Sequence, residues 1–130
     1  MTWGFDGLVK RHPFVIGLPF APPETGGVGY RVLAHFERWL TAQGMAWTRS
    51  VRKADVLLIN AWQTPLRTVL WAQALGIPFV HRVDNAAAAY GRTDGADRRL
   101  RRINRLAVSS IFQSAYAMRE TMQRGVVGMP

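Results

Sequence analysis

The sequence predicts an α/β protein of the Rossmann-like, doubly wound type, with four to five mainly parallel strands and helices on both faces of the sheet. Short apolar runs alternate with helical patterns of about ten to fifteen residues, which is typical of βαβ units. The strongest run, 54–60, contains Val-Leu-Leu-Ile without a polar break. Such a run predicts burial on both faces, as in a central parallel strand. The length of 130 residues suits one domain.

Prolines and glycines mark the boundaries of the first predicted strand and helix. After an N-terminal arm, 1–13, we expect one domain over 14–130. A buried strand is predicted at 14–18 between two prolines, followed by a Pro- and Gly-rich loop at 19–27. A helix then starts at Val28 and ends at Gly44, a usual helix stop. Its apolar stripe has helical spacing: Val28, Val32, Phe36, Trp39 and Leu40.

Two strand candidates, 46–51 and 54–60, are separated only by Arg52 and Lys53. A parallel crossover usually needs a dozen or more residues. We therefore expect the 46–51 strand to be short, to lie at an edge of the sheet, or not to be parallel.

The remaining elements are better delimited. Thr64 is a candidate cap and Pro65 a candidate first residue of a helix that ends at Gly76. A strand at 79–83 and a loop at 84–95 follow, with a helical turn at 86–89. A helix at 97–107, with Asp97 near its cap, precedes a strand at 108–114 and a last helix at 115–124.

Composition and charge limit the possible functions and the possible cellular location of the protein. The formal charge is +9, and fifteen of the seventeen basic residues are arginine. Two explanations fit this excess of arginine. One is the codon bias of a GC-rich genome, and the other is a functional preference for anions, either phosphorylated ligands or an acidic membrane surface. Absence of cysteine excludes disulfides and thiolate zinc sites. No run reaches the roughly 20 apolar residues of a membrane span, and the N-terminus lacks the apolar segment of a signal peptide. We expect a cytoplasmic protein.

Polar residues follow each predicted strand at its carboxyl end, where open parallel sheets bind ligands. The glycine loop 24–29 (ETGGVG) joins a strand to a helix N-terminus, which favours an anion, although a turn that needs positive φ angles explains it equally. His81 and Asp84 are candidates for orienting a hydroxyl or taking its proton. His81 as a core histidine and Arg82 as a partner of Asp84 are the alternatives. The three histidines do not cluster with acids, so no metal is expected.

The densest charge lies at 97–105, where leucine and isoleucine face inward on a predicted helix. Five arginines point outward: Arg98, Arg99, Arg101, Arg102 and Arg105. A solvated helix face and a basic surface for anionic lipid headgroups are both compatible with this pattern. Binding of nucleic acid is the third and least favoured interpretation of this helix, because no aromatic residues for base stacking are interleaved with the arginines.

Several segments together resemble the N-terminal, acceptor-side domain of GT-B, group 1 (GT4-type) glycosyltransferases. The resemblance runs from 14 to 125 and rests on the order and spacing of five segments: 24–29, 54–60 (ADVLLIN), 76–84 (GIPFVHRVD), 102–107 (RINRLA) and 111–116 (IFQSAY). It implies two Rossmann-like domains in the complete enzyme, with a nucleotide-sugar as co-substrate bound in the cleft between them. No further cofactor is expected.

The resemblance also implies roles for individual residues. Gly26, Gly27 and Gly29 would form the glycine loop near the donor phosphates, and His81 and Asp84 would be catalytic. Contacts to the acceptor or the transferred sugar are expected from residues in or beside the loops at the carboxyl ends of the predicted strands: Glu24, Asn60, Trp62, Arg82, Asn85 and Ser114. Asn85 departs from the family, which often has glycine there. The chain ends where the linker to the donor-binding domain would begin, so we expect it to be inactive alone.

Three hypotheses follow. The first is the acceptor half of a glycosyltransferase, whose partner is a separate donor-binding domain or a second copy of the chain. The second is a non-catalytic, arginine-rich module that docks on anionic membrane, at its inner face, or on nucleic acid. The third is a different doubly wound protein that binds a nucleotide.

Overall fold

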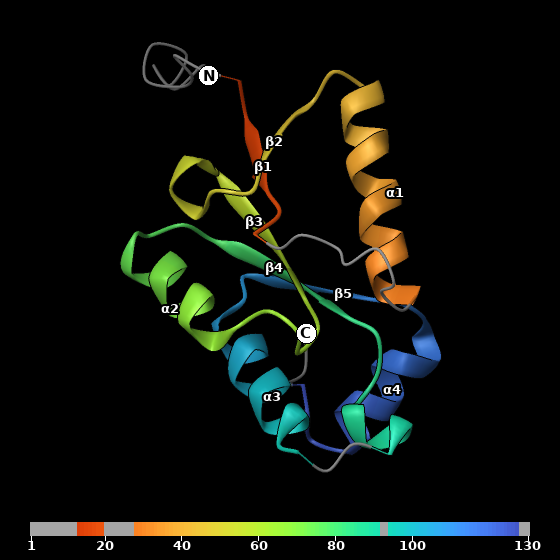
Figure 1. Ribbon diagram of the computed structural model, residues 1–130. Helices are drawn as coiled ribbons and strands as arrows, with labels where there is room; N and C mark the ends of the chain where they lie inside the picture. The colour runs from red at the N-terminus through yellow and green to blue at the C-terminus, as the bar shows by residue number, and fades with distance from the viewer. Residues whose placement is uncertain (1–12, 20–27, 92–93, 128–130) are drawn as a thin grey trace, which may run out of the picture.

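The computed structural model of the protein describes residues 13–19, 28–91 and 94–127 (Figure 1). Five strands and four α-helices follow one another, with two short 3-10 helices, η2 and η3, between them. In chain order the elements are β1 (Val15–Gly17), α1 (Val28–Ala42), β2 (Ala46–Thr48), η2 (Val51–Lys53), β3 (Val56–Asn60), α2 (Leu66–Ala74), β4 (Phe79–Val83), η3 (Ala87–Tyr90), α3 (Ala96–Leu106), β5 (Ser109–Phe112) and α4 (Ala115–Gln123).

The predicted α/β, doubly wound fold is confirmed. All five strands are parallel and lie in the order β2-β1-β3-β4-β5. The chain moves from β1 outward to β2, then returns across β1 to β3 and continues to β5. The strand order therefore reverses at β1. At such a reversal, the loops at the carboxyl ends of the two neighbouring strands diverge and leave a crevice for ligands.

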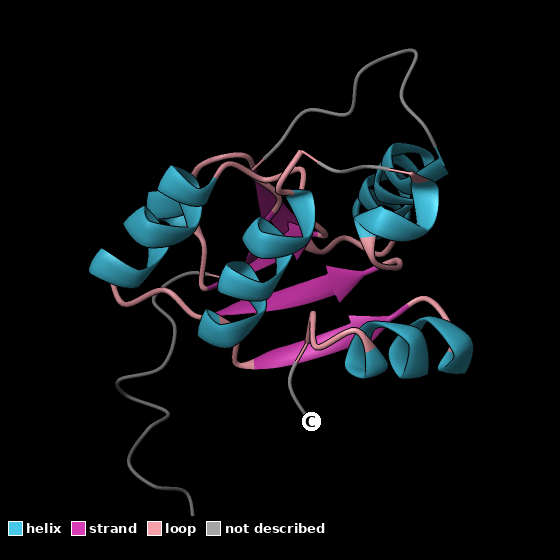
Figure 2. Ribbon diagram, turned by 90° about the horizontal axis from the view of Figure 1, so that it is seen from below, coloured by secondary structure: helices cyan, strands magenta, loops and turns pink. Residues whose placement is uncertain are grey.

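Helices flank the sheet (Figure 2), with α2 and α3 in contact with each other on one side and α1 on the other (Figure 1). Side-chain alternation along the strands explains this arrangement. Leu57 and Phe79 point toward α2 and α3, whereas Leu58 and Val80, the next residue in each strand, point toward the side of α1. Both faces of the central strands are apolar, as the unbroken run in the sequence predicts.

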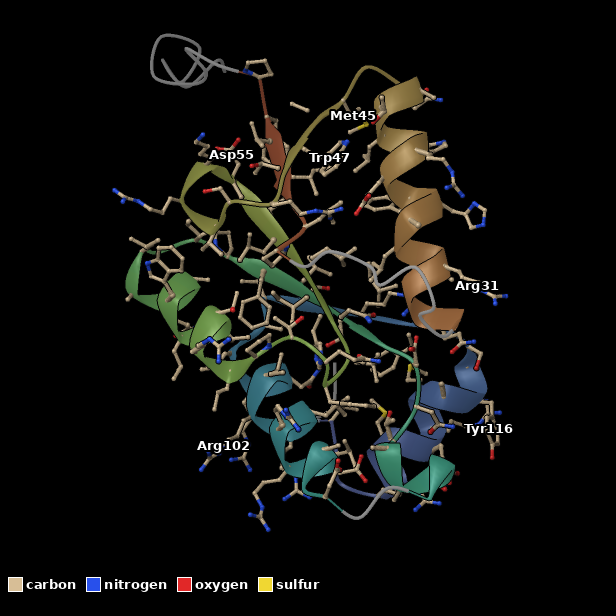
Figure 3. The ribbon with its side chains drawn as sticks, viewed as in Figure 1. Arg31, Met45, Trp47, Asp55, Arg102 and Tyr116 are labelled. Carbon is tan, nitrogen blue, oxygen red and sulfur yellow. The ribbon has the colours of Figure 1, made fainter. Side chains whose placement is uncertain are left out.

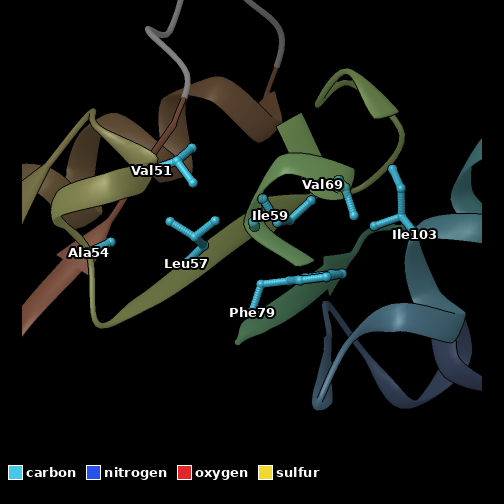
Figure 4. Packing of buried hydrophobic residues seen from close by; sticks show 8 residues of the cluster. Val51, Ala54, Leu57, Ile59, Val69, Phe79 and Ile103 are labelled. Carbon is cyan, nitrogen blue, oxygen red and sulfur yellow. The ribbon is translucent and has the colours of Figure 1, made fainter. Parts of the chain in front are cut away.

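The main core lies between the sheet and the α2–α3 layer. Leu57, Ile59 and Phe79 of the strands pack against Val69 of α2 and Ile103 of α3 (Figure 4). All five are at most 1% exposed. This core ties β3 and β4, the strands that carry the candidate site, to a rigid layer.

The junction between β2 and β3 shows which of the three expectations for the second strand hold. β2 is short and lies at the sheet edge, as two of the three alternatives required, and it is parallel to β1. The crossover takes only residues 49–55, including η2, so the requirement for a dozen residues was wrong here. Because β1 lies between β2 and β3, the link must span about 10 Å across the sheet, and seven extended residues reach roughly twice that distance.

One predicted helix cap was wrong, and a residue expected near another cap has a second role. α2 begins at Leu66 with Pro65 as its N-cap residue, and the Thr64 hydroxyl is buried without a hydrogen-bond partner among the described residues. α3 begins after Gly95, and the carboxylate of Asp97 lies in its first turn. That carboxylate accepts hydrogen bonds from the backbone N–H groups of Ala87 (2.5 Å) and Ala88 (3.1 Å). Asp97 thus lies near the start of α3, as expected, and its carboxylate also holds the start of η3.

Candidate functional site

Three polar side chains meet at the carboxyl ends of β3 and β4. Asn60 and Arg82 are direct neighbours in the strand register. Arg82 Nη1 donates to Asn60 Oδ1 at 2.9 Å and lies 2.5 Å from Asp84 Oδ1. Asn60 Nδ2 in turn donates to Gln63 Oε1 at 3.2 Å. We call Asn60, Arg82 and Asp84 the polar cluster, and Arg82 holds it together.

The polar cluster is only partly shielded from solvent. Asn60 is buried, whereas the side chains of Arg82 and Asp84 are 13% and 19% exposed. The contact between the last two is a close ion pair between Arg82 Nη1 and Asp84 Oδ1. Oδ1 itself is inaccessible to solvent, so a bound hydroxyl group would reach Asp84 only through the remaining, exposed part of its side chain.

The pKa of Asp84 is raised above its ordinary value. Burial is the largest cause, because it disfavours the charged carboxylate, and the positive charge of Arg82 opposes it. A carboxylate with a raised pKa is a stronger base than a solvated one. This is the property that a proton acceptor near neutral pH requires.

His81 occupies a different position from the polar cluster. Its side chain is fully buried on the α3 side of β4. Ring atom Nε2 donates to the backbone oxygen of Ala61 at 2.8 Å, and Nδ1 accepts from Asn104 Nδ2 at 3.0 Å. The same Asn104 amide donates its second hydrogen to Ser110 Oγ at 2.8 Å. With both nitrogens bonded, His81 has the geometry of the core histidine that was the alternative interpretation.

Burial also lowers the pKa of His81 to about 4, with the hydrogen bond to Ala61 acting in the opposite direction. The ring is therefore neutral at physiological pH. Asn104 and Ser110, which complete this chain of hydrogen bonds, were not recognised as site residues from the sequence. Asn104 lies in one of the segments that carry the family resemblance, but its spacing from His81 gave no indication of a contact.

The turn after β3 is strained. Ala61 has a φ of +38°, the only positive φ of a non-glycine residue in the described part of the chain. This region is unfavourable for residues with a Cβ and persists only where surrounding contacts enforce it. Two contacts from β4 do so: Ala61 N donates to the backbone oxygen of Arg82 at 2.7 Å, and its oxygen accepts from His81. The sequence offered no signal for this, since alanine is not typical of left-handed turns.

An apolar groove of about 320 Å³ lies on the α1 side of the sheet and is bounded by Arg82 among its lining residues. Val32 and Phe36 of α1 form one wall, while Leu58 and Val80 of the strands lie in its floor. The volume falls at the lower end of the range for small-molecule sites. The exposed lining of the groove is entirely apolar, so Arg82 borders the groove with its carbon atoms while its guanidinium belongs to the polar cluster. Neither the groove nor this connection was predicted from the sequence.

The other predicted site residues have local roles or lie outside the described residues. Ser114 caps α4 by accepting from Ala117 N at 3.0 Å, and Asn85 Oδ1 accepts from the next backbone N–H at 2.7 Å. Trp62 is half-buried and packs beside the core cluster that contains Ala61. Gly29 lies in α1, whereas Glu24, Gly26 and Gly27 are outside the described residues. The structure therefore brings together Asn60, Arg82 and Asp84 of the predicted set.

The predicted arginine surface lies on α3, with Arg98, Arg101, Arg102 and Arg105 exposed and Arg99 half-buried. Arg101 Nε donates to the backbone oxygen of Gly125 at 2.9 Å. In the chain outside the masked stretches, no three His, Asp or Glu residues are grouped as a metal site would require. None of the helices that the structure describes is long and apolar enough to cross a bilayer.

The carboxyl edge of this parallel sheet thus carries a polar cluster beside an apolar groove, next to the reversal of strand order. Comparison with known proteins adds no relative: no family model, no curated protein and no solved structure matches the chain.

Proposed function

We propose that this chain is the acceptor-side half of a glycosyltransferase, and that it binds the hydroxyl compound to which a sugar is transferred from a nucleotide-sugar. One observation carries the proposal. Arg82 joins Asn60 and Asp84 at the carboxyl ends of adjacent strands and also lines an apolar groove. The resemblance of the sequence to group 1 glycosyltransferases supports the same assignment.

The polar cluster has the chemistry of a carbohydrate site. Sugar hydroxyls both donate and accept hydrogen bonds, and they need partners of both kinds. Arg82 supplies N–H donors, and the carboxylate of Asp84 supplies acceptor oxygens. The apolar side chains of the groove suit the C–H faces of a sugar ring or an apolar group attached to it. A ligand with both kinds of surface fits the site better than a purely ionic one.

In the proposed reaction, the acceptor hydroxyl oxygen forms a bond to the anomeric carbon of the donor sugar. The bond from that carbon to the nucleoside diphosphate breaks, and the diphosphate leaves with the electron pair. Asp84 is the residue we assign to accept the hydroxyl proton, because its pKa is raised and Arg82 fixes its position. His81 is assigned a positioning role through the Ala61 turn, because both of its ring nitrogens are already bonded.

Catalysis needs more than these residues supply. Stabilising the charge on the leaving diphosphate requires donors aimed at it, and the nucleotide must be held in line with the acceptor. The resemblance assigns both tasks to a donor-binding half. We therefore expect this chain alone to bind an acceptor without transferring sugar to it.

The proposal is tested by NMR titration of the ¹⁵N-labelled chain with hexyl glycosides of glucose, galactose and mannose, and separately with UDP-glucose. At least one glycoside is expected to shift the amide signals of Leu58, Asn60, Arg82 and Asp84 in a saturable manner. Arg82→Ala and Asp84→Asn should each weaken binding by about tenfold or more, as loss of a hydrogen bond to a charged group does. UDP-glucose should leave these signals unchanged.

Arg119→Ala provides the matched control, because Arg119 is exposed on α4 and belongs neither to the polar cluster nor to the lining of the groove. It should bind the glycoside as the wild type does. Folding of each variant is checked by the dispersion of its NMR spectrum. The proposal fails if no glycoside shifts the polar cluster, or if UDP-glucose alone shifts it as strongly as a glycoside.

A further inference from the structure

A second surface, on the opposite side of the sheet from the groove, combines exposed apolar side chains with positive charge. Leu70 and Trp71 of α2 and Leu75, the residue that follows the helix, are 52%, 48% and 43% exposed. Large apolar residues scattered singly over a surface are ordinary, but three within six consecutive residues at the end of one helix form a patch that water solvates poorly. We call Leu70, Trp71 and Leu75 the α2 patch.

The α2 patch is flanked by basic residues from the elements on either side. Arg102 and Arg105 of α3 line a shallow depression together with Leu70 (Figure 3 labels Arg102, which points away from the ribbon). On the other flank α2 contacts η2, whose Arg52 and Lys53 are exposed. In Figure 1, η2, α2 and α3 follow one another along the left side of the molecule.

This surface has almost no compensating negative charge. The segments η2, α2 and α3 contain two, one and five basic residues respectively, and their only acidic residue is Asp97. The carboxylate of Asp97 is bonded to the backbone of η3 and is half-buried. Arg102 and Arg105 have no ion-pair partner in the part of the chain that the structure describes. Their charge is therefore free to attract an anionic surface.

We propose that the surface formed by η2, α2 and α3 docks the protein on an anionic lipid bilayer. Leu70, Trp71 and Leu75 enter the boundary between headgroups and acyl chains, where tryptophan is favoured, while Arg102 and Arg105 contact the phosphates. Neither half of the surface suffices alone. Charge attracts the protein to any anionic polymer, and the apolar patch between the charges is what distinguishes a bilayer from a nucleic acid.

The bilayer proposal is independent of the proposed sugar transfer, since it uses neither the polar cluster nor the groove. The bilayer proposal and the proposed sugar transfer are nevertheless compatible. The groove opens on the α1 side of the sheet, whereas the docking surface lies on the α2–α3 side. A protein bound through the docking surface would keep its groove accessible.

The experiment is co-sedimentation of the full chain with vesicles of phosphatidylcholine mixed with phosphatidylglycerol, and with pure phosphatidylcholine vesicles as the neutral control. We expect binding to the mixed vesicles that weakens with added salt, and little binding to the neutral ones. Each arginine at a membrane surface strengthens binding by about fivefold. The double variant Arg102→Ala, Arg105→Ala should therefore bind about 25-fold more weakly.

The matched control is the double variant Arg31→Ala, Arg119→Ala, which removes the same charge from exposed positions on α1 and α4. It should lose much less affinity. Trp71→Ala should weaken binding while leaving the dependence on salt unchanged, because it removes apolar contact and no charge. Since these side chains are exposed, the fold should survive, which circular dichroism verifies.

Three outcomes would overturn the proposal. Equal losses in the two double variants would mean that net charge, and not this surface, governs binding. Unchanged binding of Trp71→Ala together with tighter binding to an oligonucleotide of matched charge would identify a nucleic-acid surface instead. Failure to bind the mixed vesicles at low ionic strength would exclude the bilayer directly.

Discussion

Buried His81 makes a specific prediction about stability and pH. In the folded protein its pKa is lowered to about 4, compared with 6.5 for an unperturbed histidine, chiefly because burial disfavours the charged ring. The unfolded chain therefore takes up the proton at a higher pH than the folded protein does. The contribution of neutral His81 to stability is fully present above about pH 6.5 and is lost as the pH falls toward 4.

The magnitude follows from the difference between the two pKa values. One pKa unit corresponds to about 1.4 kcal/mol, so complete protonation of the unfolded chain costs the folded state about 3 kcal/mol. At about pH 5, where the folded ring is still neutral, the loss is about 2 kcal/mol. The raised pKa of Asp84 acts in the opposite direction, because the folded state binds that proton more readily. Its effect must therefore be separated from that of His81.

The assay is urea denaturation followed by tryptophan fluorescence at about pH 7 and about pH 5, with His81→Gln as the variant. Glutamine does not titrate, and its amide nitrogen is suited to the hydrogen bond with the oxygen of Ala61. Both proteins retain Asp84, so its contribution cancels in their difference. We expect the wild type to lose about 2 kcal/mol more than the variant on acidification.

The control is His35→Gln, because His35 is exposed on α1, where its Nδ1 contacts Arg38. It should follow the wild type at both pH values. If His81→Gln loses as much stability on acidification as the wild type, His81 is not held neutral in the folded state, and the reasoning from its burial is wrong.

Two further predictions concern packing and an unpaired hydroxyl. A Cβ at Gly17 would lie 2.3 Å from Leu57 Cδ2 and 2.6 Å from Ala54 Cβ, so Gly17→Ala should cost about 1–3 kcal/mol in thermal melts; an unchanged melting temperature would show that β1 shifts freely. Thr64 is 1% exposed and its hydroxyl is unpaired among the described residues, so Thr64→Val should raise stability by about 1 kcal/mol in urea denaturation. A loss of stability would instead reveal a partner for that hydroxyl.

Local features of the sequence were sufficient for the elements themselves. The strand 79–83 coincides with β4, and the apolar stripe that begins at Val28 coincides with α1. Glycine stops were also predictable: Gly44 and Gly76 take left-handed φ angles after α1 and α2. Helix starts were less predictable, because a capping side chain has alternative partners. Asp97 illustrates this, since its carboxylate bonds to a segment ten residues earlier in the chain.

The candidate site was predictable only in part. Placing polar residues after parallel strands predicted Asn60 and Asp84 on one edge, because carboxyl ends of parallel strands share an edge, and Arg82 was a possible partner of Asp84. The same reasoning could not separate His81 from that group. Alternation along β4 turns His81 toward α3 and Arg82 toward α1, so two adjacent residues serve different layers.

The sequence by itself determined the α/β class, the positions of the strands and the excess of arginine, because each depends on residues close together in the chain. Tertiary structure alone decided the strand order, the burial of His81, the strained turn at Ala61, and which apolar side chains remained uncovered. These depend on contacts between distant segments, and a periodic pattern records only that a side chain is apolar. Leu57 and Leu75 look alike in the sequence, yet packing covers the first completely and leaves the second 43% exposed.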